Sequence, residues 1–464
     1  MSTGTSTRTD WQPELEALLE KVEAPGAVLA VMRGGEVSTW AAGIANVETG
    51  QPMTASTLFP IASVSKVYTA TLVMQLVDEG LLELDRPVRA YLPDFAVADP
   101  LTTAEVTARH LLSHTSGIDG DKYDSFGRGD DALARYVADC ADLAQIFRLG
   151  ATFSYCNSGF IILGRLVEVL RGLPFDVALR DHLLAPLGAT RAGMLPEDLI
   201  WRPLAAGHRR DENGELGVFD QWENDRAGGP AGGVVTDVGA LLAFVRMHLD
   251  GGTTSDGTRV LSAQSTDAMR TPQVTLPDPR GESTHWGLGW ELARRPEEPG
   301  LLGHGGDLLA HHARLVVCPD SDLAVTLLVN GDGADQIADP IFRQVLAEVG
   351  ASLPQPLRPP DTPTGVDVSR VAGTYETVAV RVTLEAHDGE LEAAFRIISE
   401  RIAAMLPPDQ QEDRRRLVPV TDSLYVMSPD DPGDPWEPVV VYEAEGQRYL
   451  HIGLRAVRER PAPA

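Results

Sequence analysis

The stretch SVSKVYTATLVMQLVDEG, residues 63–80, predicts a helix whose first turn contains both Ser63 and Lys66. Apolar and threonine side chains recur along one stripe of that helix, as they do where a helix packs on a core. They are Val67, Thr71, Met74 and Val77. A serine hydroxyl is a poor nucleophile until a base removes its proton, and a lysine three residues later shares its helix face. Lys66 is therefore placed to activate Ser63.

The Ser63 and Lys66 pair also has a simpler explanation, a helix N-cap followed by an exposed cation. Lysine is scarce in this chain, however, and occurs only at positions 21, 66 and 122. Arginine supplies nearly all the other positive charge, yet it cannot offer a titratable amine. The scarcity of lysine favours a chemical role for Lys66.

Two later motifs indicate the same chemistry. Tyr155-Cys156-Asn157 precedes an apolar helix, so we expect a turn that presents its side chains. A tyrosine can relay a proton, and an asparagine can bind an amide or an amine. Cys156 between them is explained equally well by packing and by reactivity. His304-Gly305-Gly306 opens a predicted strand, where paired glycines let a substrate backbone lie alongside.

Together the three motifs resemble those of the penicillin-recognising serine enzymes, which include serine β-lactamases, penicillin-binding proteins, D-aminopeptidases and related esterases. The marks of that superfamily are SxxK, a YxN or SxN element, and a KTG or HxG strand. Supporting phrases are LLSHTSG at 111–117, GGV at 232–234 and WGLGW at 286–290. The resemblance covers about residues 10–350.

The resemblance implies a role for each catalytic side chain. Ser63 corresponds to the nucleophile and Lys66 to the general base. Tyr155 would protonate or deprotonate the attacking and leaving groups, and Asn157 would orient Lys66 and bind the substrate amide. His304 stands where the KTG form has lysine, which points away from ordinary β-lactam hydrolysis and toward the class C-like esterase and D-aminopeptidase branch.

The resemblance also implies how the substrate is held. The backbone N–H groups of Ser63 and Asp307 would form the oxyanion hole, two donors aimed at charge that appears in the tetrahedral intermediate. Gly305 and Gly306 would lie beside the substrate backbone.

Other conspicuous residues have plainer explanations. His114 is expected to be structural, and His311-His312 lack a third ligand at metal spacing. The glycines at 228–233 lack the tail of a phosphate loop. We therefore expect no metal, nucleotide or other cofactor.

The pattern predicts an α/β fold in two domains. Residues 10–352 read as a serine β-lactamase-like domain, in which strands from both ends form one antiparallel sheet with a helical cluster on one side. The expected strands include 287–292, and the expected last helix runs from Pro340 to Val349. A proline-rich linker follows at 353–365. Residues 366–460 alternate in short strands, which predicts a small antiparallel barrel or sandwich. Of these two forms we expect a lipocalin-like barrel.

The amino-acid composition excludes some classes of binding partner. The chain has 67 acidic and 39 basic residues among 464, a formal net charge of -28. Nucleic acid and anionic membrane surfaces would be repelled, so neither is expected as a partner. Met1 to Asp10 is polar and lacks an apolar core, and the three cysteines show no CxxC, so we expect a cytoplasmic protein with reduced thiols.

An intracellular SxxK, YxN and HGG domain with an appended β-domain resembles the penicillin-binding-protein-type thioesterases. That resemblance implies a peptidyl thioester substrate, presented by a peptidyl carrier protein and released as a macrocycle. The alternative is a D-stereospecific peptidase or esterase that releases the acyl group to water. A non-catalytic scaffold on the same fold is the third hypothesis, and the complete Ser63, Lys66 and Tyr155 set argues against it.

The β-domain is expected to cap the active-site cleft. Polar Tyr449, His451 and Arg455 alternate with apolar residues, which predicts one polar strand face and places Arg455 on the last strand. The hypothesis is that Arg455 contacts the substrate's C-terminal acyl residue. A solvated barrel arginine is the alternative explanation.

Overall fold

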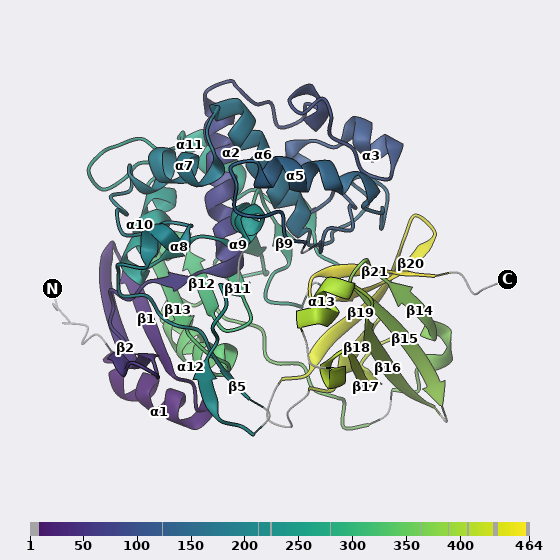
Figure 1. The fold of residues 1–464 in the computed structure, drawn as a ribbon. Coiled ribbons are helices and arrows are strands. Elements are labelled where there is room, and N and C mark those ends of the chain that lie inside the picture. The colour runs from purple at the N-terminus through teal and green to yellow at the C-terminus, as the bar shows by residue number, and fades with distance from the viewer. Residues whose placement is uncertain are drawn as a thin grey trace.

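Strands from the two ends of the N-terminal domain pair with each other in this computed structural model (Figure 1). The structure describes residues 9–460 except 123, 212, 223–224, 279, 363, 388, 406–407 and 430–434. Most of the segment used to predict the absence of a leader, residues 1–8, and Pro363 of the linker therefore lie outside the described residues.

The sheet of the N-terminal domain is antiparallel, and its order is β3-β2-β1-β13-β12-β11-β10-β9-β8. Its centre is buried on both faces: along β1 (Gly26–Arg33), successive side chains enter two different hydrophobic cores. The other strands are β2 (Glu36–Asn46), β3 (Gln51–Pro52), β8 (Val274–Thr275), β9 (His285–Trp286), β10 (Glu291–Ala293), β11 (Leu301–Asp307), β12 (His312–Cys318) and β13 (Leu323–Val329).

Helices cover the two faces of this sheet unequally. α1 (Gln12–Val22) and α12 (Ala334–Ala347) pack on one face. A larger helical cluster built around α2 (Ser65–Asp78) and α6 (Asn157–Arg171) covers the other. Its remaining helices are α3 (Pro100–Glu105), α4 (Ala108–Leu112), α5 (Ala132–Asp139), α7 (Phe175–Leu179), α8 (Pro196–Leu199), α9 (Gly229–Gly232), α10 (Val238–Leu249) and α11 (Ala263–Met269).

Two predicted elements of this domain are wrong in extent. The predicted strand 287–292 is interrupted by a turn in which the N–H of Gly287 donates to the Trp290 carbonyl, and Gly289 has φ +92°. The last helix begins at Ala334, so Pro340 lies inside it. Proline removes a helix hydrogen bond, but burial of Ile337, Ile341 and Phe342 against the sheet outweighs this local penalty.

The C-terminal domain is a closed antiparallel barrel in which each strand pairs with the next and the last returns to the first. This is the up-and-down arrangement found in lipocalins, and it removes every exposed sheet edge. The strands are β14 (Gly373–Glu376), β15 (Val380–His387), β16 (Glu390–Ile397), β17 (Glu412–Pro419), β18 (Leu424–Met427), β19 (Glu437–Ala444), β20 (Gln447–Ile452) and β21 (Arg455–Glu459), and α13 (Glu400–Met405) follows β16. The predicted combination of a β-lactamase-like domain and a barrel is confirmed.

The barrel touches the N-terminal domain through its last hairpin. The predicted polar face of this segment is wrong, because a two-residue turn at Gly453-Leu454 separates β20 from β21. Both turn residues have positive φ, 52° and 66°, as a tight hairpin requires. Tyr449 and His451 are buried rather than solvated, and Tyr449 packs with Ile146 and Phe147 of the other domain. The hairpin therefore carries Arg455 into the space between the domains.

Candidate active site

Ser63 and Lys66 meet at the start of α2. Ser63 lies in a 3-10 turn, Ala62–Val64, and Lys66 follows in the first turn of the helix. The Lys66 Nζ donates to the Ser63 Oγ at 3.1 Å and to the Ala231 carbonyl at 2.6 Å. Ala62 before the serine has φ +48°, a strained conformation for a residue other than glycine. The turn thus presents the Ser63 hydroxyl to a buried amine.

Burial sets the protonation of that amine. The Lys66 side chain is completely buried, which lowers its pKa well below the usual value. The positive charge of Arg455 lowers this pKa further, whereas Asp121 and Cys156 act in the opposite direction. A lowered pKa favours the free amine, which is the form that can accept the Ser63 proton.

Tyr155 lies between the two domains. Its backbone N–H donates to the Leu454 carbonyl of the barrel hairpin at 2.9 Å. The Lys66 Nζ lies 4.8 Å from the centre of the Tyr155 ring, and the Arg455 guanidinium lies 4.9 Å from it. The His114 ring stacks on the same tyrosine with centroids 4.4 Å apart. The Arg455 cation, the Lys66 amine and the neighbouring rings therefore surround Tyr155 and fix its position.

Asn157 belongs to a polar junction that also contains Asp121 and Arg455. The Asn157 Nδ2 donates to Asp121 Oδ1 at 2.8 Å. The Arg455 Nε donates to Asp121 Oδ2 at 2.8 Å and its second amino group to Oδ1 at 3.2 Å. The structure therefore brings Arg455 to the site instead of leaving it solvated on the barrel.

His304 lies on β11, beside Tyr155, and is buried. Its Nδ1 is 2.6 Å from the Gly305 carbonyl, which can only accept, so Nδ1 carries a proton. Burial lowers the pKa of His304, although Glu291 nearby acts in the opposite direction. The ring is then neutral with a lone pair on Nε2, and that atom has no hydrogen-bond partner among the described residues. His304 thus retains an unused hydrogen-bond acceptor, buried beside Tyr155.

The end of β11 runs directly past Ser63. A Cβ on Gly306 would lie 2.4 Å from the Ile61 carbonyl oxygen and 3.0 Å from the Ser63 nitrogen, so only glycine fits there. Asp307 turns its carboxylate to His312 and Arg314, at 2.7 and 2.9 Å. Burial would raise the pKa of Asp307, but these partners lower it to about 2. The strand therefore brings the Gly306 backbone against the Ser63 backbone, and the oxyanion hole at the Ser63 and Asp307 N–H groups stays a prediction.

The sequence predicted no role for Asp121, and it predicted only a structural role for His114. Asp121 carries no signal in a chain with 67 acidic residues, and its importance comes from two partners far away in sequence, Asn157 and Arg455. The His114 Nδ1 accepts the Cys156 N–H at 2.9 Å, and burial lowers the pKa of its ring well below the usual value. Burial also raises the pKa of Cys156 to about 12, so its thiol packs rather than reacts.

The described residues contain neither a cluster of metal ligands nor a helix that could span a membrane. Among the described parts of the chain, no group of three His, Cys, Asp or Glu side chains could hold a metal ion. No helix in these parts is long and apolar enough to cross a membrane.

The fold and the site together define a penicillin-recognising serine enzyme, with an antiparallel sheet, a buried lysine on the serine and a glycine strand beside them. The chain belongs to the Beta-lactamase family, whose model matches residues 14–348. It is thus a member of a serine hydrolase and acyltransferase family, in agreement with the three motifs.

Relatives of the chain carry several names. It is 43% identical to Penicillin-binding protein 4 of Amycolatopsis lactamdurans over 373 residues, which cover 79% of this chain and 97% of the relative. It is 28% identical to a D-aminopeptidase of Brucella anthropi over 340 residues, 70% of this chain and 60% of that one. Among solved structures, SurE superposes with a TM-score of 0.77 and 28% identity over 97% of this chain and 98% of its own, and it has also been solved with D-Leu.

Proposed function

We propose that this protein is a serine acyltransferase of the penicillin-binding-protein-type thioesterase kind, which takes a peptidyl thioester from a carrier protein and releases it as a macrocycle. The observation that carries the acyl-enzyme is the contact of 3.1 Å between the Lys66 amine and the Ser63 hydroxyl, in which the lysine side chain is completely buried and the serine is partly exposed. A general base must reach the proton that it removes, and it must be unprotonated to do so.

In the first half-reaction, the Lys66 amine takes the Ser63 proton as the oxygen attacks the thioester carbonyl. Negative charge on the carbonyl oxygen is stabilised by the backbone N–H groups of Ser63 and Asp307. The carbon–sulfur bond then breaks, and Tyr155 supplies a proton to the departing thiolate. The product is an ester on Ser63.

In the second half-reaction, the amino group at the other end of the same peptide attacks that ester. It forms an amide bond, gives up a proton to Tyr155, and the Ser63 oxygen takes its proton back from Lys66. Asn157 and His304 would hold the amides and the acceptor. An amine tethered to the acyl chain is present at high effective concentration, which favours cyclisation over hydrolysis.

The position of the barrel favours the hypothesis that the acyl acceptor is not bulk water. Its last hairpin lies against the catalytic tyrosine through Leu454, and Arg455 occupies the junction with Asp121. A similar chain, SurE, was solved with D-Leu, which fits a site that accepts D-configured residues. We propose that the Arg455 guanidinium also contacts the substrate's C-terminal acyl residue.

A hydrolytic D-peptidase or esterase is the second candidate function. The same Ser63, Lys66 and Tyr155 geometry would serve it with water as acceptor, and the similarity to D-aminopeptidases favours it. The two candidates share the acyl-enzyme and differ in the acceptor.

Intact mass spectrometry separates these functions. The protein is incubated with a peptidyl N-acetylcysteamine thioester and, separately, with a penicillin. We expect an adduct on Ser63 from the thioester and a cyclic peptide in excess of the linear acid. Linear acid alone would establish the hydrolase, and turnover by Ser63→Ala would refute the acyl-enzyme.

The role of Arg455 needs its own variant. Arg455→Ala should fold and form the Ser63 adduct more slowly, with cyclic product reduced at least tenfold, because the cation that orients the acyl residue is absent. Circular dichroism reports the fold. Full cyclisation activity in this variant would contradict the contact.

A further inference from the structure

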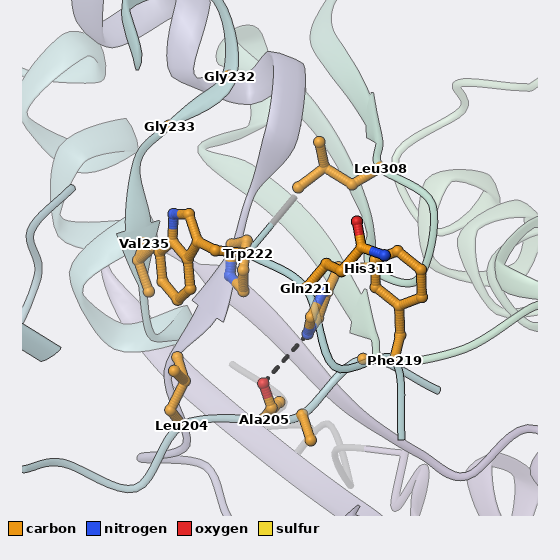
Figure 2. Close-up of a pocket in the computed structure, with 13 residues that line it drawn as sticks. Leu204, Ala205, Phe219, Gln221, Trp222, Gly232, Gly233, Val235, Leu308 and His311 are labelled. Carbon is orange, nitrogen blue, oxygen red and sulfur yellow. Dashed lines mark hydrogen bonds between the residues drawn. The ribbon is translucent and has the colours of Figure 1, made fainter. Parts of the chain in front are cut away.

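A small apolar pocket lies beside the reactive serine in the described part of the chain. Its volume is about 120 Å³. Figure 2 shows the side chains of Leu204, Trp222 and Val235 on one side of it and that of Leu308 on the other. None of these residues was assigned a role by the sequence motifs.

The lining of this pocket selects by polarity. It contains no acidic or basic side chain apart from His311, although the chain as a whole has 67 acidic residues. The His311 Nε2 lies 3.1 Å from the Ala205 carbonyl, which engages that ring nitrogen (Figure 2). A charged group placed here would lose its water and meet no opposite charge among the described lining residues, whose polar side chains are Gln221, Trp222 and His311. The occupant is therefore apolar.

The volume limits the size of that occupant. An apolar protein cavity of about 150 Å³ holds one benzene molecule. A pocket of about 120 Å³ therefore suits a branched aliphatic side chain or a single small ring.

The pocket adjoins the reaction centre on both sides. Pro60 in its wall stands three residues before Ser63, and Gly232 directly follows Ala231, whose carbonyl accepts from Lys66. The two walls are joined by a hydrogen bond of 2.9 Å from the Ile61 N–H to the Val234 carbonyl. Leu308 directly follows Asp307. A group attached to a carbonyl on Ser63 can therefore reach the pocket.

The direction of β11 indicates which part of the substrate enters the pocket. His304 lies at the end of the site where Tyr155 is found, and the leaving group must depart beside the tyrosine that protonates it. Leu308 is four residues further along, roughly 13 Å for an extended chain. The pocket thus lies on the side away from the leaving group, where the acyl part of the substrate extends.

We propose that this pocket is the specificity site for the acyl residue, and that it takes a branched aliphatic or small aromatic side chain of the residue esterified to Ser63. The inference rests on the proposed acyl-enzyme, and it adds the class of side chain that the enzyme selects. A hydrophobic pocket that is filled by the substrate raises kcat/KM for acylation relative to a smaller side chain.

The test compares thioesters that differ only in the side chain of the acyl residue. N-Acetylcysteamine thioesters of N-acetylated alanine, leucine, phenylalanine and aspartate, in both enantiomers, are reacted with the protein, and Ser63 acylation is followed by intact mass. We expect the leucyl or phenylalanyl ester of the accepted enantiomer to react about ten- to a hundredfold faster than the alanyl ester. The aspartyl ester should be the slowest.

Two variants locate the selectivity. Leu308→Trp should fill the pocket and bring the leucyl to alanyl ratio close to one. Leu309→Trp is the matched control, because this neighbour is exposed and does not line the pocket, and it should keep the ratio. Trp222→Ala opens the wall instead, so it should improve reaction of a naphthylalanyl ester relative to the leucyl ester.

The outcomes separate the pocket from the proposed reaction. Equal acylation of Ser63 by the thioesters of all four side chains would overturn the pocket assignment while leaving the acyl-enzyme intact. Dependence on the side chain of an added amine, and not on that of the acyl group, would overturn it as well. No Ser63 adduct from any ester would instead refute the proposed function itself.

Discussion

At the scale of single residues, the reactivity of Ser63 depends on charges that surround one buried amine. Among the described residues, no carboxylate forms an ion pair with Lys66; instead Asp121 accepts hydrogen bonds from Arg455 and Asn157. Arg455 lowers the pKa of Lys66 and Asp121 raises it, so these two opposite charges partly offset each other's effect on that pKa. A change in either partner should therefore appear in catalysis before it appears in folding.

Asp121→Asn tests the junction itself. The amide keeps an oxygen for the Asn157 Nδ2 but loses the charge that holds the Arg455 guanidinium. We expect kcat/KM for acylation to fall about ten- to a hundredfold, since hydrogen bonds to charged groups contribute about 1.5–3 kcal/mol. Asp124→Asn is the control, because that carboxylate lies on the surface against Lys122. Equal effects of the two variants would contradict the assignment.

Arg455 should also set the pH range of the reaction. Without its positive charge the protonated amine is less disfavoured, so the pKa of Lys66 rises and the free base forms only at higher pH. In Arg455→Gln, the ascending limb of the pH profile of kcat/KM should therefore move to higher pH. Arg455→Lys retains the charge and should keep the limb close to that of the unaltered protein. An unmoved limb in the glutamine variant would show that this charge does not reach Lys66.

At the scale of elements, prediction from sequence succeeded where the pattern is local. The helix that carries Ser63 and Lys66 shows the apolar recurrence that a packed element requires, and the structure contains it. The strand predicted to open at His304 is also present, but it begins at Leu301. The start of α12 and the β20–β21 turn were predicted wrongly. Burial against the sheet overrides Pro340, and Leu454 adopts φ +66°, which its residue type does not signal. Asp121 could not be found because its partners are distant in sequence: Asn157 lies 36 residues away, and Arg455 belongs to the other domain.

The hairpin turn offers a prediction of its own. Leu454 bears the cost of a left-handed conformation, about 1–2 kcal/mol, and its side chain packs in a cluster with Phe153, Tyr155 and Trp286. Leu454→Ala keeps the backbone bond to Tyr155 and removes that packing. We expect faster proteolysis of the 353–365 linker and slower acylation, because the barrel docks less firmly. Ile398→Ala, an exposed barrel residue, is the control and should change neither rate.

At the scale of the whole molecule, the two domains share one reaction centre. Leu454, Arg455 and Ala456 of a single hairpin bond to Tyr155, Asp121 and Ser154 in turn. A buried carboxyl, Asp119, makes a further contact across the interface, accepting the Val378 N–H at 2.6 Å. Docking of the barrel is therefore linked to protonation at the interface.

Asp119→Asn tests this link by its effect on stability. Burial raises the pKa of Asp119 to about 7, aided by Asp121, while the Val378 N–H and Arg460 act in the opposite direction. The folded protein therefore keeps the proton above the pH, about 4, at which the unfolded chain loses it. The folded state binds more protons in this window, so the free energy of unfolding falls as pH rises from about 4 to 7, by at most about 4 kcal/mol from this group.

Asparagine keeps an oxygen for the Val378 N–H and has no proton to lose. The difference in unfolding free energy between Asp119→Asn and the unaltered protein should therefore grow in favour of the variant as pH rises from 4 to 7, and then level off. Urea unfolding at several pH values measures that difference. Asp124→Asn again serves as control for the loss of one carboxylate, because that side chain is 51% exposed against Lys122. A pH-independent difference for Asp119→Asn would mean that this carboxyl ionises in the folded protein as it does in water, and that docking of the barrel is not linked to its proton.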